Sequence, residues 1–326
     1  MHSEIKNTME LYPLKFKPIF KETVWGGGRL KSVLNKNITP DKKVGESWEL
    51  SAVRGNLSVV SNGYLKGNSI EELVEVYMGE LVGDKVYEQF GNEFPLLVKF
   101  IDANETLSVQ VHPDDATAAE RHHAFGKTEA WYVLAAEPEA KIAVGFSKDT
   151  NLSELLEHIK NNSLQEIIKL ESAKAGDAFF IPAGTVHAIG KGILIAEIQQ
   201  TSDITYRIYD WGRSDKNRPL HTELAMDIIN YNAAKGNKLS TSNIEELVSC
   251  PYFTINQLNL AHPAERNLLE HDSFIIYICT EGAAQISAQG QGETLNLGET
   301  LLIPASLSDV QITPQGNVKL LEVYIK

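Results

Sequence analysis

Four side chains in separated segments have the types and spacing of a divalent-metal site. Gln110 and His112 lie two residues apart, and a strand would place both on one face. His187 ends the pattern G-x5-P-x-G-x2-H, in which an apolar run and a Pro-Gly turn lead to the histidine. Glu129 precedes another apolar run. Two imidazoles, a carboxylate and an amide oxygen suit one Zn²⁺ per chain, or another divalent ion, with an open position for substrate.

Each candidate ligand also has an ordinary structural interpretation. A lone strand histidine is more often a core or surface residue than a ligand, but His112 and His187 occur together at fixed turn spacing. That combination favours the metal site. Gln110 keeps an alternative role, because an amide oxygen binds zinc weakly and its amide could instead hydrogen-bond a neighbouring strand.

A second polar block spans residues 197–213, where charged residues interrupt an apolar run that should be a strand. Burying a carboxylate and a guanidinium together costs several kcal/mol unless the groups are paired or used. The block is therefore either a structural Asp–Arg pair on a solvated edge, or an anion clamp with an acid/base group at the mouth of the metal site.

The elements that would position these residues are mostly strands. Short strand and turn patterns dominate residues 95–146 and 252–325, and they recur around 178–181 and 193–198. Helical periodicity is confined to about 69–90, 151–170 and 222–231, the first opening with a Ser69–Glu72 capping box. The run Trp25–Gly28 predicts a loop with close backbone approach. Mostly β structure with inserted helices predicts a jelly roll, or double-stranded β-helix, present twice.

An internal repeat supports the two units. The segments 175–183 and 297–305 share the pattern G-x5-P. Further along the second copy, Asp309 stands where the first has His187, and alignment of Tyr132 with Tyr277 puts Phe274 where Glu129 was. The scaffold pattern is thus present twice and the ligand set once. We expect a catalytic unit over 1–235, a linker around 232–243, and a β domain without metal ligands over 236–326.

Composition excludes several classes of function. The 326 residues include 43 acidic and 30 basic side chains, a net charge of -13, which disfavours nucleic-acid and anionic-membrane partners. Cys250 and Cys279 form no C-x-x-C motif and are expected to be free thiols. Residues 1–6 lack the apolar core of a signal peptide, and no apolar run is long enough to span a membrane. A cytoplasmic protein is expected.

The chain resembles the type I mannose-6-phosphate isomerases of the cupin superfamily, in their short bacterial form. The resemblance covers essentially the whole chain, and several separated blocks agree in order. The blocks are 23–27, 45–49, 107–113, 126–129, 182–187 and 197–213. The resemblance implies two cupin units, the first with the metal site. It also implies an isomerase that interconverts mannose 6-phosphate and fructose 6-phosphate through a cis-enediol.

The resemblance also implies roles for single residues. The zinc ligands would be Gln110, His112, Glu129 and His187. Arg207 would be the catalytic arginine of the block S-D-x-x-x-R, with Asp203 at its acidic position, Lys127 as the lysine two before the metal glutamate, and Ser108 at the phosphate. This chain is short between Glu129 and His187, where longer members carry a helical domain.

In the mechanism that follows, Glu197 or Asp203 would shuttle the proton between C1 and C2. Lys127 would assist as a proton partner or oxygen stabiliser, and Arg207 would orient the substrate or neutralise its negative charge. The expected partner is a small-molecule sugar phosphate, and the chain would be a monomer or weak homodimer. The rivals are a cupin dioxygenase or other metal-dependent sugar enzyme, and a non-catalytic sugar-binding cupin. An amide in place of a third imidazole, and the nearby Lys and Arg, favour sugar-phosphate chemistry.

Overall fold

The computed structural model describes residues 10–39, 41–213, 218–241 and 245–326. The expectation about residues 1–6, and the end of the linker at 242–243, lie outside these residues. The chain forms two compact units. We call residues 17–58 and 94–252 the central unit, and the N-terminal residues to 16, residues 59–93 and residues 253–326 the C-terminal unit.

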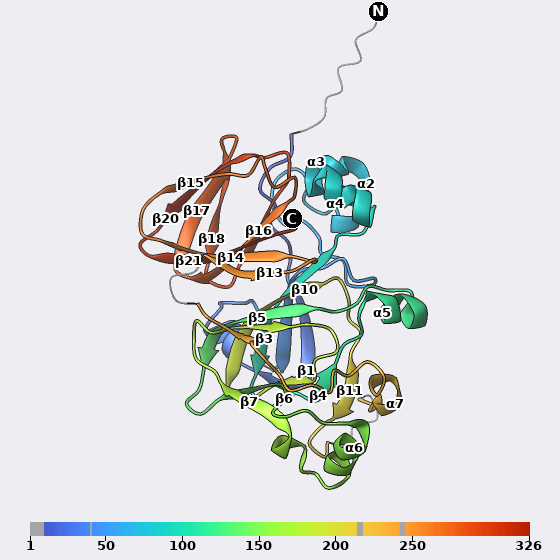
Figure 1. The fold of residues 1–326 in the computed structure, drawn as a ribbon. Coiled ribbons are helices and arrows are strands. Elements are labelled where there is room, and N and C mark those ends of the chain that lie inside the picture. Colours follow the sequence, from blue (N-terminus) through green and yellow to red (C-terminus); the bar gives the residue numbers. More distant parts are fainter. Residues whose placement is uncertain (1–9, 40, 214–217, 242–244) are drawn as a thin grey trace, which may run out of the picture. The chain divides into compact units, whose positions relative to one another are not determined.

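The central unit contains two antiparallel sheets with the strand orders β1-β2-β3-β10-β5-β8-β12 and β11-β4-β9-β6-β7 (Figure 1). The larger sheet comprises β1 (Ile19–Gly27), β2 (Val44–Leu50), β3 (Leu96–Ala103), β5 (Glu129–Ala136), β8 (Ala178–Ile181), β10 (Ile193–Gln200) and β12 (Lys238–Leu239). The smaller comprises β4 (Val109–Val111), β6 (Lys141–Phe146), β7 (Ile168–Ser172), β9 (His187–Ile189) and β11 (Tyr206–Tyr209). The predicted mostly-β jelly roll with inserted helices is confirmed.

Alternation along the strands builds the core of the central unit. Trp131 and Val133 of β5 and Ile193 and Ile195 of β10 pack in one buried cluster with Ile142 of β6. The intervening residues of the smaller sheet pack on its other face, in a second cluster that includes residues of α6 (Leu152–Lys160) and η1 (Leu164–Glu166). The inner layer between the sheets is where a side chain is shielded from water on all sides.

Two predicted helices are shorter than expected. Residues 168–172 form strand β7, because Leu170 and its neighbours pair with the edge of β6 instead of continuing the helix. In the second, the α-helix α7 covers Thr222–Ala225 alone. The chain leaves the helical path before residue 230, because the Asn230 amide donates to the Gly184 carbonyl at 2.8 Å. Part of the expected linker is also structured, since β12 pairs with β8.

The glycine-rich run near the start is strand rather than loop. Trp25 to Gly27 end β1, and α1 (Arg29–Ser32) follows. A Cβ on Gly26 would lie 2.6 Å from the Gly45 nitrogen of β2, so no larger residue fits at this position. The expected close approach is therefore correct, and its partner is the backbone of the neighbouring strand.

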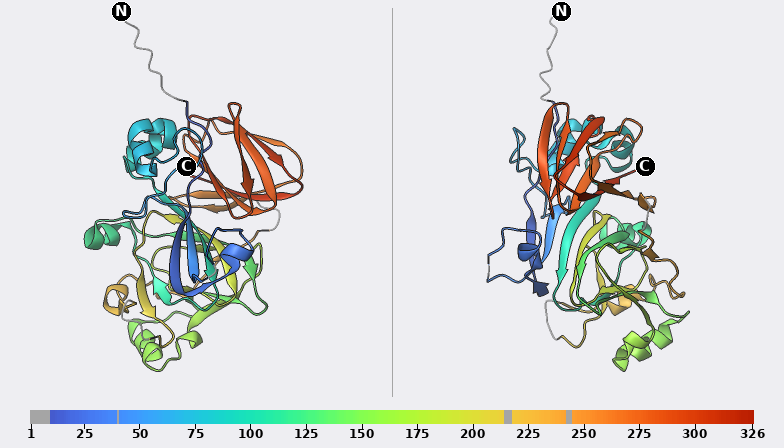
Figure 2. Two further views of the ribbon diagram at one scale, coloured as in Figure 1. Left: turned by 180° about the vertical axis from the view of Figure 1, so that it is seen from behind. Right: turned by 90° about the vertical axis from the view of Figure 1, so that its left-hand side faces the viewer.

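The C-terminal unit contains two sheets, whose strands are orange to red in Figure 2. One has the strand order β14-β21-β16-β19 and the other the order β15-β20-β17-β18. Strand β13 (Glu246–Ser249) precedes the unit boundary at Tyr252. The strands are β14 (Thr254–Leu260), β15 (Ala264–Asn267), β16 (Ile275–Glu281), β17 (Ala283–Ala288), β18 (Gln291–Asn296), β19 (Thr300–Ile303), β20 (Asp309–Pro314) and β21 (Val318–Tyr324). Their inner faces enclose one apolar cluster.

The boundaries of the units differ from the predicted division at 235/236. The segment that contains α2 (Ile70–Tyr77), α3 (Gly79–Val82) and α4 (Asp84–Phe90) belongs to the C-terminal unit. The Val82 carbonyl accepts from the Phe274 amide, and the Asp272 carboxylate accepts from the Asp84 amide at 2.9 Å. These bonds attach the helices to the C-terminal strands. The predicted capping box at Ser69 is confirmed, and it starts α2.

Strand register also corrects the internal repeat by one residue. Tyr277 pairs with Glu322 as Trp131 pairs with Glu197, so Tyr277 corresponds to Trp131 rather than to Tyr132. Ile275 instead of Phe274 then occupies the Glu129 position, which remains apolar and buried. The second copy therefore still lacks that carboxylate.

Glu322, which pairs with Tyr277, is a fully buried carboxylate whose hydrogen-bond donors all lie in the C-terminal unit. Its carboxylate accepts from Arg266 at 2.6 and 3.1 Å, from the Tyr277 hydroxyl at 2.9 Å and from the Asn256 amide at 3.1 Å. A buried charge with four donors is satisfied without a metal ion or ligand.

Within the described residues, no helix is both long and apolar enough to cross a membrane.

Candidate metal centre and active site

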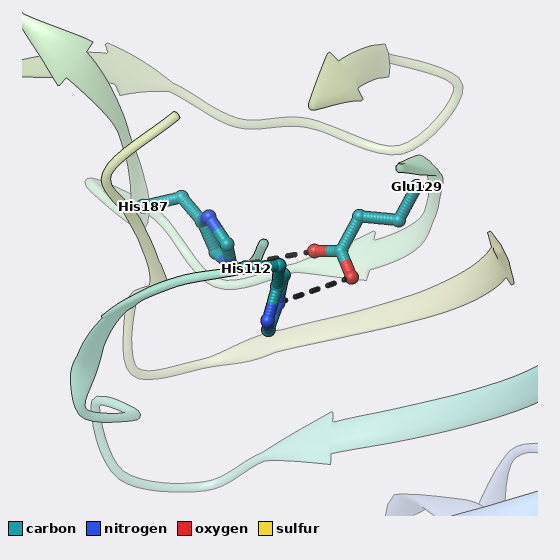
Figure 3. A group of neighbouring side chains, drawn as sticks. All are labelled: His112, Glu129 and His187. Atoms are coloured by element: carbon teal, nitrogen blue, oxygen red, sulfur yellow. Dashed lines mark ion pairs between the residues drawn. The ribbon is translucent and has the colours of Figure 1, made fainter. Parts of the chain in front are cut away.

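Three buried side chains meet in the inner layer of the central unit (Figure 3). His112 follows β4, Glu129 begins β5 and His187 begins β9. His112 Nε2 lies 3.4 Å from Glu129 Oε2, and His187 Nε2 lies 3.4 Å from Glu129 Oε1. All three side chains are at most 1% exposed. Their ligand atoms lie within 4.8 Å of one another, so the three could hold one metal ion.

Main-chain carbonyls set the tautomer of both imidazoles. His112 Nδ1 donates to the Ile204 carbonyl at 2.9 Å, and His187 Nδ1 donates to the Thr185 carbonyl at 2.8 Å. Each Nε2 is then left with a lone pair that faces Glu129. Burial and the Lys127 charge lower the pKa of His112 to about 3, and burial also lowers the pKa of His187. Both rings are therefore neutral at pH 7, the form that binds metals.

Glu129 supplies the negative charge of the group. Burial favours its neutral form, but Lys127 and the two histidines outweigh this effect and hold its pKa well below the ordinary value. Among the described residues neither carboxylate oxygen has a hydrogen-bond partner, although Lys127 Nζ forms an ion pair with Oε2 at 3.1 Å. Two imidazole lone pairs around a buried, unsatisfied carboxylate form a donor set that fits a divalent cation.

Gln110 lies in one row with two other predicted site residues. It pairs with His187 of β9 on one side and with Arg207 of β11 on the other. Its Nε2 is 3.2 Å from His187 Nε2, and a flip of the side-chain amide would place Oε1 near this His187 nitrogen instead. Side chains of paired residues share a face of a sheet, so Gln110 and Arg207 project from the same face of the smaller sheet as His187.

Lys127 lies inside the group. Its Nζ is 3.1 Å from His112 Nε2 and 3.1 Å from Glu129 Oε2, and the residue is 4% exposed. The ammonium therefore lies where it could donate to a substrate oxygen next to a metal held by these ligands.

Glu197 is buried in β10 and paired with a residue that sequence reasoning missed. Its Oε1 lies 2.7 Å from Lys99 Nζ, and its Oε2 accepts from Trp131 Nε1 at 2.8 Å. Burial and the Glu129 charge raise the pKa of Glu197, against the opposing effect of Lys99. Trp131 also packs edge-on against His187, with ring centroids 5.4 Å apart. The available signal was a lysine within the apolar run 95–101 and a glutamate within the apolar run 193–198, which adjacent strands β3 and β10 bring together.

Two further predicted residues lie together at the edge of the smaller sheet. Arg207 Nε donates to Ser108 Oγ at 3.1 Å, and its NH1 donates to the Pro219 carbonyl at 3.0 Å. Asp203 is different: its carboxylate is exposed and makes no hydrogen bond or ion pair within the described residues. The structure therefore does not bring Asp203 to the group, because the turn after β10 directs its side chain to solvent.

Comparisons with known proteins agree over nearly the whole chain. A model of the phosphomannose isomerase type I catalytic domain matches residues 13–152, and a model of the mannose-6-phosphate isomerase cupin domain matches 243–325. Mannose-6-phosphate isomerase ManA of Bacillus subtilis is 35% identical over 93% of this chain and 96% of its own length. The Streptococcus mutans mannose-6-phosphate isomerase is 35% identical over 92% of this chain and 94% of its own length. The crystal structure of the B. subtilis enzyme superposes with a TM-score of 0.85, at 32% identity over 97% of this chain and all of the other.

Proposed function

Because this chain belongs to the type I phosphomannose isomerase family, we propose that it interconverts mannose 6-phosphate and fructose 6-phosphate at the His112–Glu129–His187 group. The observation that carries the proposal is this buried group of two neutral imidazoles and an ionised carboxylate, with the Lys127 ammonium in contact. Zn²⁺, one per chain, is the proposed ion, with Gln110 as a fourth ligand through its amide oxygen. The substrate would react at this site as a sugar phosphate in its open-chain form.

The two sugars share a cis-enediol. A base removes the proton from C2 of the aldose or C1 of the ketose and returns it to the other carbon, while the hydroxyl proton moves between O2 and O1. A divalent ion held by the four ligands would stabilise the negative charge that develops on these oxygens, as a Lewis acid. The residues of the chain must then supply the base, the oxygen donor and the phosphate contact.

We propose a division of these tasks among the residues of the site. We assign the transfer of the carbon-bound proton to Glu197, because its buried carboxylate has a raised pKa and lies in the inner layer. The Asp203 carboxylate, in contrast, is exposed. Lys127 would donate to the oxygen that gains charge. Arg207 and Ser108, already hydrogen-bonded to each other, would hold the phosphate through the guanidinium fork and the hydroxyl. We further propose a cytoplasmic monomer or weak homodimer.

A coupled isomerase assay on mannose 6-phosphate tests the function. Activity should disappear with a chelator and return with stoichiometric zinc. His187→Ala should lose both bound zinc and turnover, whereas the exposed His262→Ala should keep both. Retention of stoichiometric zinc in His187→Ala would refute the metal assignment. Oxygen uptake by the iron-loaded protein, without isomerase activity, would instead identify a dioxygenase.

Arg207→Ala separates phosphate binding from the metal chemistry. The variant should keep its zinc and raise KM for the phosphorylated sugar, because the guanidinium donates to Ser108, the other proposed phosphate contact. A folded Arg207→Ala protein with normal kcat/KM would show that this arginine has no role in the reaction.

A further inference from the structure

Lys127 reaches the metal-ligand group from a segment that no sheet or helix holds. Residues 123–128 lie between α5 (Asp115–His122) and β5 and belong to neither element. Even so, the ammonium is placed 3.1 Å from both His112 Nε2 and Glu129 Oε2. The contacts of the loop backbone must therefore fix its position.

Side chains hold the two amides that flank Lys127. The Gly126 amide donates to Asp115 Oδ1 at 2.8 Å, and the Thr128 amide donates to Gln200 Oε1 at 2.8 Å. The two side chains are joined, because Gln200 Nε2 donates to the same Asp115 Oδ1 at 2.8 Å. Asp115 and Gln200 thus form a single brace across the loop.

Main-chain contacts complete the attachment. The Lys127 amide donates to the Pro113 carbonyl at 3.0 Å, and the Gln200 amide donates to the Thr128 carbonyl at 3.2 Å. A Cβ on Gly126 would lie 2.5 Å from the Asp115 nitrogen, so the loop lies directly against the start of α5.

The brace has no described contact with the metal ligands. Both polar atoms of the Gln200 amide are used, one by Thr128 and one by Asp115, and Gln200 is only 5% exposed. The side-chain amide of Gln200 thus bonds the loop through Oε1 and Asp115 through Nε2.

We propose that Asp115 and Gln200 are positioning residues that hold the loop 126–128 and thereby keep the Lys127 ammonium at the reaction centre. The inference rests on the proposed function, since it assigns Lys127 to the chemical step. A displacement of about 1 Å in a catalytic group can reduce the rate by about 10²-fold. We therefore expect kcat to fall about 10- to 100-fold when the brace is broken, with KM within about twofold of wild type and zinc content unchanged.

Four variants of the zinc-loaded full chain test the brace. Asp115→Ala removes the shared acceptor, and Gln200→Met removes both polar atoms at similar length. Asp115→Asn keeps an acceptor oxygen, so its kcat should stay near that of wild type. Asp114→Ala is the matched control, because the Asp114 carboxylate caps the same helix through the Thr117 amide and, among the described residues, makes no hydrogen bond to the loop.

Amide hydrogen exchange gives a readout that does not depend on activity. The amides of Gly126 and Thr128 should exchange faster in Asp115→Ala and Gln200→Met than in wild type and Asp114→Ala. The double variant Asp115→Ala/Gln200→Met should lose little more kcat than the more affected single variant, because both changes release the same loop.

The outcomes separate the two proposals. An active wild type whose Asp115→Ala and Gln200→Met variants keep normal kcat, or keep both amides protected, would overturn the brace alone. An equal loss of kcat in Asp114→Ala would show that the loss comes from a less stable helix, and this result would also overturn the brace. Wild-type protein without isomerase activity would refute the proposed function, and faster exchange would then show a structural brace without the catalytic role.

Discussion

Glu197→Gln is the substitution whose effects on stability and on activity can be separated. The wild-type carboxylate meets two donors, Lys99 Nζ at 2.7 Å and Trp131 Nε1 at 2.8 Å, one at each oxygen. A glutamine amide has only one acceptor oxygen, so one donor must lose its partner. The Lys99 ammonium would remain buried, and the Glu46 carboxylate 3.9 Å away would be its remaining ion-pair partner among the described residues.

The expected loss of stability follows from this geometry. Coulomb's law gives about 6 kcal/mol for unit charges 2.7 Å apart at an effective dielectric constant of about 20. The lost attraction is partly offset by Glu46, and breaking one partner of a buried pair usually costs about 3–5 kcal/mol. Adding Lys99→Met removes the unpaired ammonium and lets the amide oxygen accept from Trp131. We expect the double variant to recover about 2 kcal/mol of that loss.

Urea denaturation of the zinc-loaded proteins measures the free energies of unfolding, and the isomerase assay measures kcat. The double variant should regain stability without regaining turnover, because the carboxylate proposed to move the carbon-bound proton is still absent. Additive losses of stability in the double variant would refute the ion-pair reasoning. Recovery of kcat together with stability would show that Glu197 only neutralises Lys99.

Three other predictions concern pH, packing and the C-terminal unit. In metal-free protein the unfolded His112 imidazole binds a proton below about pH 6.5, whereas the folded one does so only near pH 3. The free energy of unfolding should therefore fall by up to about 1.4 kcal/mol per pH unit as the pH drops between these values. Denaturation at pH 7 and pH 5 measures this loss, which should be smaller in His112→Gln. Gly26→Ala should lower the melting temperature sharply, because its Cβ would meet β2 backbone, whereas Gly28→Ala, with open space around it, should not. Tyr277→Phe should lower the free energy of unfolding by about 1.5–3 kcal/mol, since it removes one donor from buried Glu322, and an unchanged value would contradict that role.

The metal-ligand group could be predicted from sequence because its signals are local. The spacing of Gln110 and His112 fixes a shared strand face, and the Pro-Gly turn fixes the position of His187 relative to its strand. The structure places these residues together with Glu129 as expected. Their roles in catalysis are still predictions.

Non-local pairing limited the rest. Lys99 and Glu197 are 98 positions apart, and only the register of β3 against β10 makes them partners. The helical segment 69–90 has clear helical periodicity, but periodicity does not say which unit the helices attach to, and backbone bonds to residues 272–274 decide that. The motif predicted the position of Asp203 in the sequence of the site but not the direction of its side chain. A turn determines whether its carboxylate faces solvent.

The carbonyls that orient the two imidazoles belong to the main chain at Thr185 and Ile204. Every residue type offers the same carbonyl, so the side chains at these two positions can vary without any change in which ring nitrogen carries the proton. The orientation of the histidines is thus encoded in the path of two turns rather than in any residue identity. A search for functional positions by residue type would pass over both, although a shift of either turn would rotate a ligand away from Glu129.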